Sequence, residues 1–90
     1  MSVITGGELL ARAMRAEGIE IFFGLPSPEI DPLFAQFEKH GIRLVPMRHE
    51  AAAVHMADAW GRLTGEVGVA LVTGGPGHAN AVSALYTALA

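Results

Sequence analysis

Glu50 is the side chain of this sequence whose type and position raise a chemical question. It follows a strand-like run at residues 42–45 and begins a helical stretch of mostly small apolar residues, Ala51-Ala52-Ala53 and onward. Taken alone, it is best explained as a first-turn carboxylate that interacts favourably with the helix dipole, worth about 0.3–1 kcal/mol. Its pKa is subject to opposing influences, because a helix terminus stabilises the charged form, whereas enclosure by apolar neighbours and another chain disfavours it.

The spacing of the histidines argues against a metal site formed by His49, Glu50 and His55. Zinc-binding histidines on one helix face lie four residues apart. Here they are six apart, which at 3.6 residues per turn separates them by about 120°. The chain has no cysteine, which excludes disulfides and thiolate zinc sites. We assign no metal ligand.

A second unusual segment is the tight loop that contains Gly74, Gly75, Pro76 and Gly77. Glycines let the main chain approach a ligand closely, and a helix N-terminus favours an anion or a polar ring. The same composition also fits an ordinary strand-to-helix turn. No lysine stands in the Walker-A position and the spacing is not Gly-x-Gly-x-x-Gly, so a nucleotide motif is only weakly supported.

Periodicity and capping signals predict helices that alternate with strands. Thr5 and Glu8 have capping-box spacing, and Ser27 followed by Pro28 suits the N-cap and first residue of the next helix. The expected strands are residues 19–23, 42–45 and 67–72, and the expected helices are 6–17, 28–40, 50–63 and 78–90. The expected inward-facing residues of the helices are Leu9, Leu10, Ala13 and Met14, then Ile30, Leu33, Phe34 and Phe37, and finally Val82, Leu85 and Leu89. Trp60 and Met56 are expected to pack, and Asp58 and Arg62 to form a solvated pair.

This order, α-β-α-β-α-β-α, predicts an α/β fold with three layers and a parallel sheet. Ligands bind such sheets at the carboxyl ends of the strands, where residues 24–28, 46–50 and 73–80 lie. The last helical stretch reaches Ala90 without a cap, so we expect the chain to be part of a longer protein.

The composition narrows the classes of partner. Charged residues make up 17% of the chain, against about 25% in globular proteins, which suggests that part of the surface meets another domain or chain. A net charge of -3 without a basic cluster argues against nucleic acid. No secretory signal and no apolar run near the ~20 residues of a membrane helix is visible, so a soluble, cytoplasmic protein is expected.

Four stretches together carry a resemblance that covers nearly all of the chain: ITGGELL, EGIEIFFGLP, RHEAAA and ALVTGGPGHAN. In this order and spacing, the sequence resembles the beginning of the pyrimidine-binding (Pyr) domain of thiamine-diphosphate-dependent enzymes. The branch is that of acetolactate synthase, benzoylformate decarboxylase and benzaldehyde lyase. The resemblance implies that residues 1–90 are the N-terminal part of a Pyr domain, without the central and diphosphate-binding (PP) domains.

The resemblance also implies roles for individual residues. Glu50 would be catalytic, hydrogen-bonding N1′ of the cofactor's aminopyrimidine and favouring the imino tautomer that removes the C2 proton. The residues expected to bind thiamine diphosphate are Leu25, Pro26, Glu50, Thr73, Gly74, Pro76 and Asn80. The diphosphate and Mg²⁺ would be held by the PP domain of a second subunit, in a homodimer or homotetramer. FAD, present in some relatives, is not indicated.

Departures from the family pattern bear on the substrate. Ser27 replaces a glycine of the first loop, Gly74 replaces a serine of the third, and Glu29 stands where benzaldehyde lyase has a histidine. The implied reaction makes or cleaves a C–C bond next to a carbonyl, with a 2-keto acid or related acyl donor as substrate. The alternatives are a non-catalytic nucleotide- or anion-binding module that uses Gly74–Gly77, and a remnant that only docks to a partner.

Overall fold

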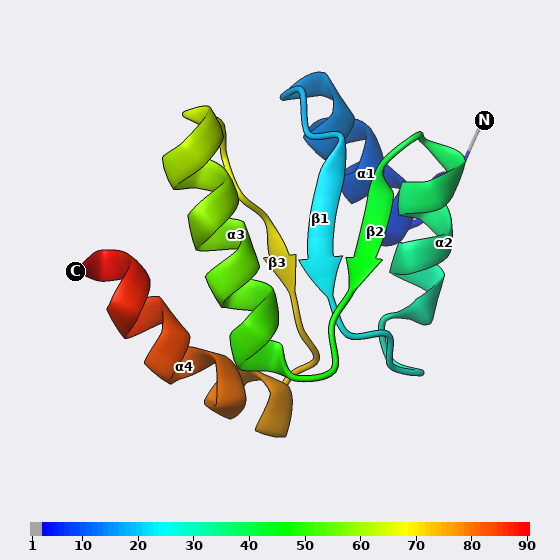
Figure 1. Cartoon of the computed structure of the whole chain (residues 1–90). Coiled ribbons are helices and arrows are strands. Elements are labelled where there is room, and N and C mark those ends of the chain that lie inside the picture. The colour runs from blue at the N-terminus through cyan, green and yellow to red at the C-terminus, as the bar shows by residue number, and fades with distance from the viewer. Residues whose placement is uncertain (1–2) are drawn as a thin grey trace.

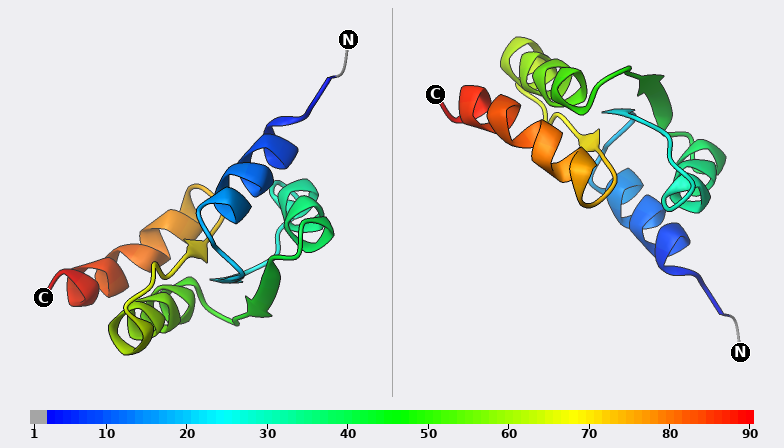
Figure 2. Two further views of the ribbon diagram at one scale, coloured as in Figure 1. Left: turned by 90° about the horizontal axis from the view of Figure 1, so that it is seen from above. Right: turned by 90° about the horizontal axis from the view of Figure 1, so that it is seen from below.

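A parallel sheet of three strands lies between two pairs of helices in the computed structural model, which describes residues 3–90 (Figure 1). Helices α1 and α2 cover one face of the sheet and α3 and α4 lie on the other, as both views in Figure 2 show. The elements are α1 (Gly6–Ala16), β1 (Ile21–Gly24), α2 (Asp31–Lys39), β2 (Arg43–Pro46), α3 (Glu50–Thr64), β3 (Ala70–Leu71) and α4 (Pro76–Leu89). The predicted α/β fold with a parallel sheet is confirmed.

The first strand is the centre of the sheet, whose order is β2-β1-β3. Both pairings are parallel, with Gly24 opposite Pro46 on one side and opposite Leu71 on the other. A Cβ atom on Gly24 would lie 2.7 Å from the carbonyl oxygen of Leu71, so this position requires glycine. β3 is shorter than the predicted strand 67–72, because regular pairing with β1 extends only over Ala70 and Leu71.

The core beneath α1 and α2 is built on aromatic rings. Phe22 is 1% exposed and stacks on Phe34 at a centroid distance of 5.4 Å, while Phe37 meets it edge-on at 4.7 Å. Ala11 and Ile42 complete the buried part of this cluster. These contacts fix α2 against β1 and β2.

The opposite face of the sheet is covered through small residues. Ala53 and Ala57 of α3 pack on Phe23, and Val54 packs on Ala81 and Ala84 of α4. Gly68 passes so close to α3 that a Cβ there would lie 1.9 Å from the carbonyl oxygen of Ala57. Small side chains thus let α3 approach both the sheet and α4 closely.

Four local expectations are wrong, the last of which concerns Met56 and is described below. Leu9, Leu10 and Ala13 of α1 are exposed, because this helix packs through Ala11 and Met14. Val82, Leu85 and Leu89 of α4 are also exposed, because its buried residues are Gly77, Ala81 and Ala84.

The third concerns the start of α2. Ser27 and Pro28 do not begin this helix, which starts at Asp31 with Ile30 as the N-cap. Residues 28–30 form a turn in which the backbone N–H groups of Ile30 and Asp31 both donate to the carbonyl oxygen of Ser27. The Ser27 hydroxyl donates to Glu29 and therefore does not cap the helix.

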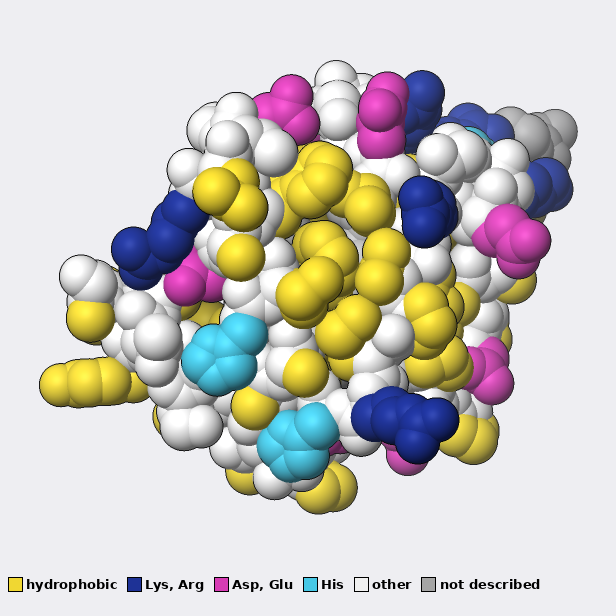
Figure 3. Space-filling model, viewed as in Figure 1, with side chains coloured by type: hydrophobic (Ala, Val, Ile, Leu, Met, Phe, Trp, Pro, Cys, Tyr) yellow, Lys and Arg dark blue, Asp and Glu magenta, His cyan; other side chains and the backbone are white. Residues whose placement is uncertain are grey.

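Hydrophobic side chains gather in the middle of the face seen in Figure 3. Ile21, Val45, Met47 and Trp60 pack on Phe23 but are only partly buried. Trp60 therefore packs as predicted, whereas Met56 is 43% exposed. Within residues 3–90, no helix is long and apolar enough to cross a membrane.

Candidate functional site

Glu50 is the first residue of α3, and α3 begins at the edge of the sheet toward which the strands point (Figure 1). The segment before it is held at two points. The backbone N–H of Met47 donates to the carbonyl oxygen of Gly24 at the end of β1, at 2.9 Å. The Nδ1 atom of His49 accepts from the backbone N–H of Ala51 at 3.0 Å and caps the helix. These contacts place Glu50 beside the end of the central strand.

The start of α4 lies against Glu50. Gly75 adopts a positive φ of 66° and Pro76 opens the helix, as suits a residue without an N–H at a helix start. The buried Gly77 faces the acid, since a Cβ there would lie 3.4 Å from Oε2 of Glu50 and 2.8 Å from Cγ2 of Thr73. Glycine at 77 thus leaves the room that the Glu50 carboxylate occupies.

An amide holds the carboxylate on its other side. Nδ2 of Asn80 donates to Oε1 of Glu50 at 3.2 Å. Among the side chains of residues 3–90, the Asn80 amide is the one that hydrogen-bonds this carboxylate. Each carboxylate oxygen accepts more than one hydrogen bond, so the group retains acceptor capacity for a ligand.

The pKa of the Glu50 carboxyl lies below its ordinary value of 4.5. The largest cause is the hydrogen bond from its own backbone N–H, followed by the one from Asn80, and the electrostatic effect of the neighbouring His49 adds to both. Partial burial acts in the opposite direction. The sequence left open which influence on the pKa of Glu50 is larger. The hydrogen bonds from the helix terminus and from Asn80 outweigh the effect of burial, so Glu50 is ionised at neutral pH.

A second acid, Glu29, joins two loops at the same edge of the sheet. Its Oε2 accepts a hydrogen bond from the hydroxyl of Ser27 at 3.2 Å and another from the hydroxyl of Thr73. Ser27 and Glu29 follow β1, whereas Thr73 follows β3. The loops after these neighbouring strands are thereby tied together by side chains.

The predicted cofactor-binding residues separate into two groups. Glu50, Thr73 and Asn80 come together around Gly77, and Gly74 and Pro76 belong to the same loop and helix start. Leu25 and Pro26 follow β1, and within residues 3–90 neither of them is hydrogen-bonded to Glu50. The roles of all seven residues stay predictions.

Sequence reasoning missed two features of this site. The cap that His49 gives to α3 has a signal in the sequence, since 49 immediately precedes the helix. The bond between Glu29 and Thr73 has none, because the two residues lie 44 positions apart.

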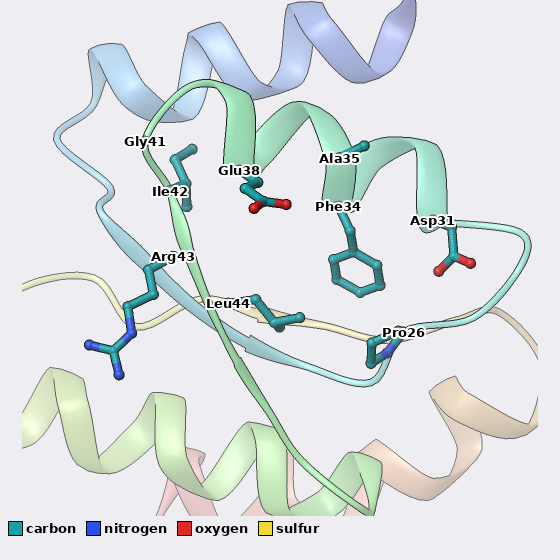
Figure 4. A pocket seen from close by; sticks show the side chains of 9 residues that line it. All are labelled: Pro26, Asp31, Phe34, Ala35, Glu38, Gly41, Ile42, Arg43 and Leu44. Carbon is teal, nitrogen blue, oxygen red and sulfur yellow. The ribbon is translucent and has the colours of Figure 1, made fainter.

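Pro26 also borders a groove of about 710 Å³ between α2 and β2 (Figure 4). Phe34, Ile42 and Leu44 give the groove an apolar lining, and Arg43 and Glu38 are its charged side chains nearer the Gly41 end. Glu50 does not line it, so it is separate from the site around Gly77.

No metal site accompanies these residues. Residues 3–90 contain no group of three histidine or acidic side chains arranged to hold a metal ion. Asp58 and Arg62 form the expected ion pair on α3, with 2.9 Å between Nε and Oδ1, and the pair is solvent-exposed.

A parallel sheet with an acid, an amide and a glycine-rich helix start at the carboxyl ends of its strands defines an α/β ligand-binding domain. The family model described as "Thiamine pyrophosphate enzyme, N-terminal TPP binding domain" matches residues 4–90, and the chain belongs to this family.

Relatives in two classes of enzyme resemble the chain. It is 51% identical over 87 residues to 2-hydroxyacyl-CoA lyase 2 of Mus musculus, covering 97% of the chain and 14% of that protein. It is 45% identical over 83 residues to the catabolic acetolactate synthase of Raoultella terrigena, covering 92% of the chain and 15% of the relative. It is 44% identical over 89 residues to the acetolactate synthase isozyme 3 large subunit of Escherichia coli (strain K12), covering 98% of the chain and 16% of that protein. The chain thus spans a small part of the length of these relatives.

The residues at the site fit the aminopyrimidine end of thiamine diphosphate. The Glu50 carboxylate is an acceptor for one polar ring atom, and the missing Cβ of Gly77 leaves space beside its Oε2.

Proposed function

We propose that this chain forms the pyrimidine-binding part of a thiamine-diphosphate-dependent enzyme, in which Glu50 hydrogen-bonds N1′ of the aminopyrimidine ring. The observation that carries the proposal is the Glu50 carboxylate, held by Asn80 at the carboxyl ends of the strands. Membership of the thiamine pyrophosphate enzyme family supports it.

Each residue contributes a distinct property to this role. Glu50 supplies the acceptor, and the hydrogen bond from Asn80 fixes the orientation of its carboxylate toward the ring nitrogen. Gly77 leaves the approach unobstructed, and main chain at Leu25, Pro26 and residues 73–76 would line the ring. A partner domain that closed over the edge would exclude water, and this desolvation would raise the pKa of Glu50 toward a value suited to sharing a proton.

When bound, thiamine diphosphate supplies a carbon nucleophile and an electron sink for reactions at a carbonyl carbon. The whole protein would make or cleave a C–C bond next to a carbonyl, and both lyases and acetolactate synthases are among the relatives. A 2-keto acid or related acyl donor is the proposed substrate class. The diphosphate and Mg²⁺ would be held by a PP domain, in a homodimer or homotetramer.

Hydrogen exchange at C2 of the bound cofactor tests the role of Glu50. Glu50→Gln in the complete enzyme keeps the size of the side chain but weakens its acceptor and proton-sharing capacity. A positioned acid–base group contributes about 10²–10⁴-fold, so the variant should exchange at least about 100-fold more slowly. Glu66→Gln, an exposed acid after α3, is the control. Exchange at the unchanged rate in Glu50→Gln would refute the proposal.

A second candidate is an anion-binding module built on the start of α4. That helix begins without a side-chain cap and without an acid in its first turn, so its backbone N–H groups are available to an anion. This reading predicts that the 90-residue chain itself binds inorganic phosphate or ATP. The thiamine diphosphate proposal predicts almost no binding, and titration calorimetry with each ligand distinguishes the two.

A further inference from the structure

The tie between Glu29 and Thr73 links the loop after β1 to the loop that leads into α4. β1 and β3 are neighbours, with Gly24 opposite Leu71, so both loops leave the sheet side by side. The backbone turn at residues 27–31 is closed by bonds to the carbonyl oxygen of Ser27 alone. The Glu29 carboxylate is therefore the side-chain link between this turn and Thr73.

Thr73, which is hydrogen-bonded to Glu29, also lies close to the space beside Glu50. Its Cγ2 packs where a Cβ of Gly77 would stand, at 2.8 Å. The same point lies 3.4 Å from Oε2 of Glu50. The Thr73 methyl and the Glu50 carboxylate thus both border the space beside Gly77, and the hydroxyl of Thr73 is held by Glu29.

We propose that Glu29 is a positioning residue of the site, which holds Thr73 against Gly77 and thereby sets the width of the space beside Glu50. This inference rests on the proposed function, because the space is taken to receive the pyrimidine ring. Glu29 is exposed and exchanges its hydrogen bonds with water, so the contribution of the tie is modest until a partner covers the edge.

The experiment measures the dissociation constant of thiamine diphosphate in the complete enzyme. Glu29→Ala removes the acceptor, and Thr73→Val removes the donor at constant shape. Each should weaken binding about three- to tenfold, the range for the net contribution of one ordinary hydrogen bond. The double variant should bind no more weakly than the weaker single variant, because both changes break the same link.

Two variants separate positioning from general destabilisation. Glu29→Gln retains an acceptor oxygen, and its affinity should return to within about twofold of the unchanged protein. Glu17→Ala, an exposed acid beyond α1, should leave the affinity unchanged. Additive effects of Glu29→Ala and Thr73→Val, or a Glu29→Gln variant as weak as Glu29→Ala, would overturn the positioning role.

The positioning role of Glu29 and the cofactor role of Glu50 can be refuted independently of each other. Slow C2 exchange in Glu50→Gln together with unchanged affinity in Glu29→Ala would remove only the positioning role. Unchanged exchange in Glu50→Gln would remove the proposed function, whatever Glu29 does.

Discussion

The side-chain amide of Asn80 donates a hydrogen bond of 3.2 Å to Oε1 of Glu50, joining α4 to the first residue of α3. The two residues lie 30 positions apart, and the close packing of α3 on α4 through Val54, Ala81 and Ala84 brings them together. The bond orients the carboxylate and stabilises its charged form.

Removal of the Asn80 amide should raise the pKa of Glu50. In Asn80→Ala the second-largest cause of the lowered pKa is absent, and the backbone N–H bond remains. The pKa should therefore move toward 4.5 without passing it by much. Carbon-detected NMR titration of the Glu50 carboxyl in this chain measures the change. Ser83→Ala, on the same helix, is the control, and an equal pKa in Asn80→Ala and the parent chain would contradict the assigned contact.

The lowered pKa of Glu50 also predicts how stability depends on pH. A carboxyl whose pKa is lower in the folded than in the unfolded chain stabilises the fold above the unfolded value. That stabilisation is lost as the pH falls from about 4.5 through the folded pKa. Urea unfolding of this chain between pH 3 and 7 should show a smaller loss of stability at acid pH in Glu50→Gln. An identical pH dependence in both proteins would show that Glu50 makes no such contribution.

Gly77→Ala should reduce stability although alanine favours a helix. The new Cβ would meet Thr73 Cγ2 at 2.8 Å, and overpacking costs about 1–3 kcal/mol, which exceeds the gain of about 1 kcal/mol in helix propensity. A net loss of about 1 kcal/mol in the free energy of unfolding is expected.

The controls for Gly77→Ala lie in the same loop. Gly74→Ala meets no atom within 4 Å and should stay within about 0.5 kcal/mol of the parent. Thr73→Ser deletes Cγ2, so it should restore stability in the Gly77→Ala background. If the combination is no more stable than Gly77→Ala alone, Thr73 is not the obstacle.

Gly68→Ala should be the most damaging glycine substitution tested. A Cβ at 68 would lie 1.9 Å from the carbonyl oxygen and 2.6 Å from the carbonyl carbon of Ala57, and helix backbone cannot move aside as a side chain can. The free energy of unfolding should fall by more than about 3 kcal/mol. Circular dichroism during urea unfolding measures this, with Gly6→Ala, which meets nothing within 4 Å, as the control. A stable Gly68→Ala chain would mean that α3 does not lie against residue 68.

Several elements of the fold could be predicted because their signals are local. The cap at Thr5 forms, with its hydroxyl accepting from the backbone N–H of Glu8 at 3.1 Å. Helix α3 begins at Glu50 as expected and ends one residue later than predicted, at Thr64. The alternation of helices with apolar strands was sufficient to predict the parallel sheet, which the strand pairing confirms.

The inward faces of α1 and α4 could not be predicted in the same way. The large apolar residues of each helix share one side, with Leu9 and Leu10 on α1 and Leu85 and Leu89 on α4, so periodicity favours that side over the alanines. Leu85 is 51% exposed while Ala84 is 1% exposed. Close approach of two helices selects small residues for the contact, and which helices approach is a property of the whole fold.

The sequence by itself determined the family, the order of the elements and the acid at the head of α3, because these depend on residue types and short-range spacing. The cytoplasmic location, the domain assignment and the cofactor roles of single residues stay predictions. Only the tertiary structure decided that Asn80 holds Glu50 and that Glu29 holds Thr73. Each contact joins residues at least 30 positions apart, and such pairs meet only after the strands have paired and the helices have packed.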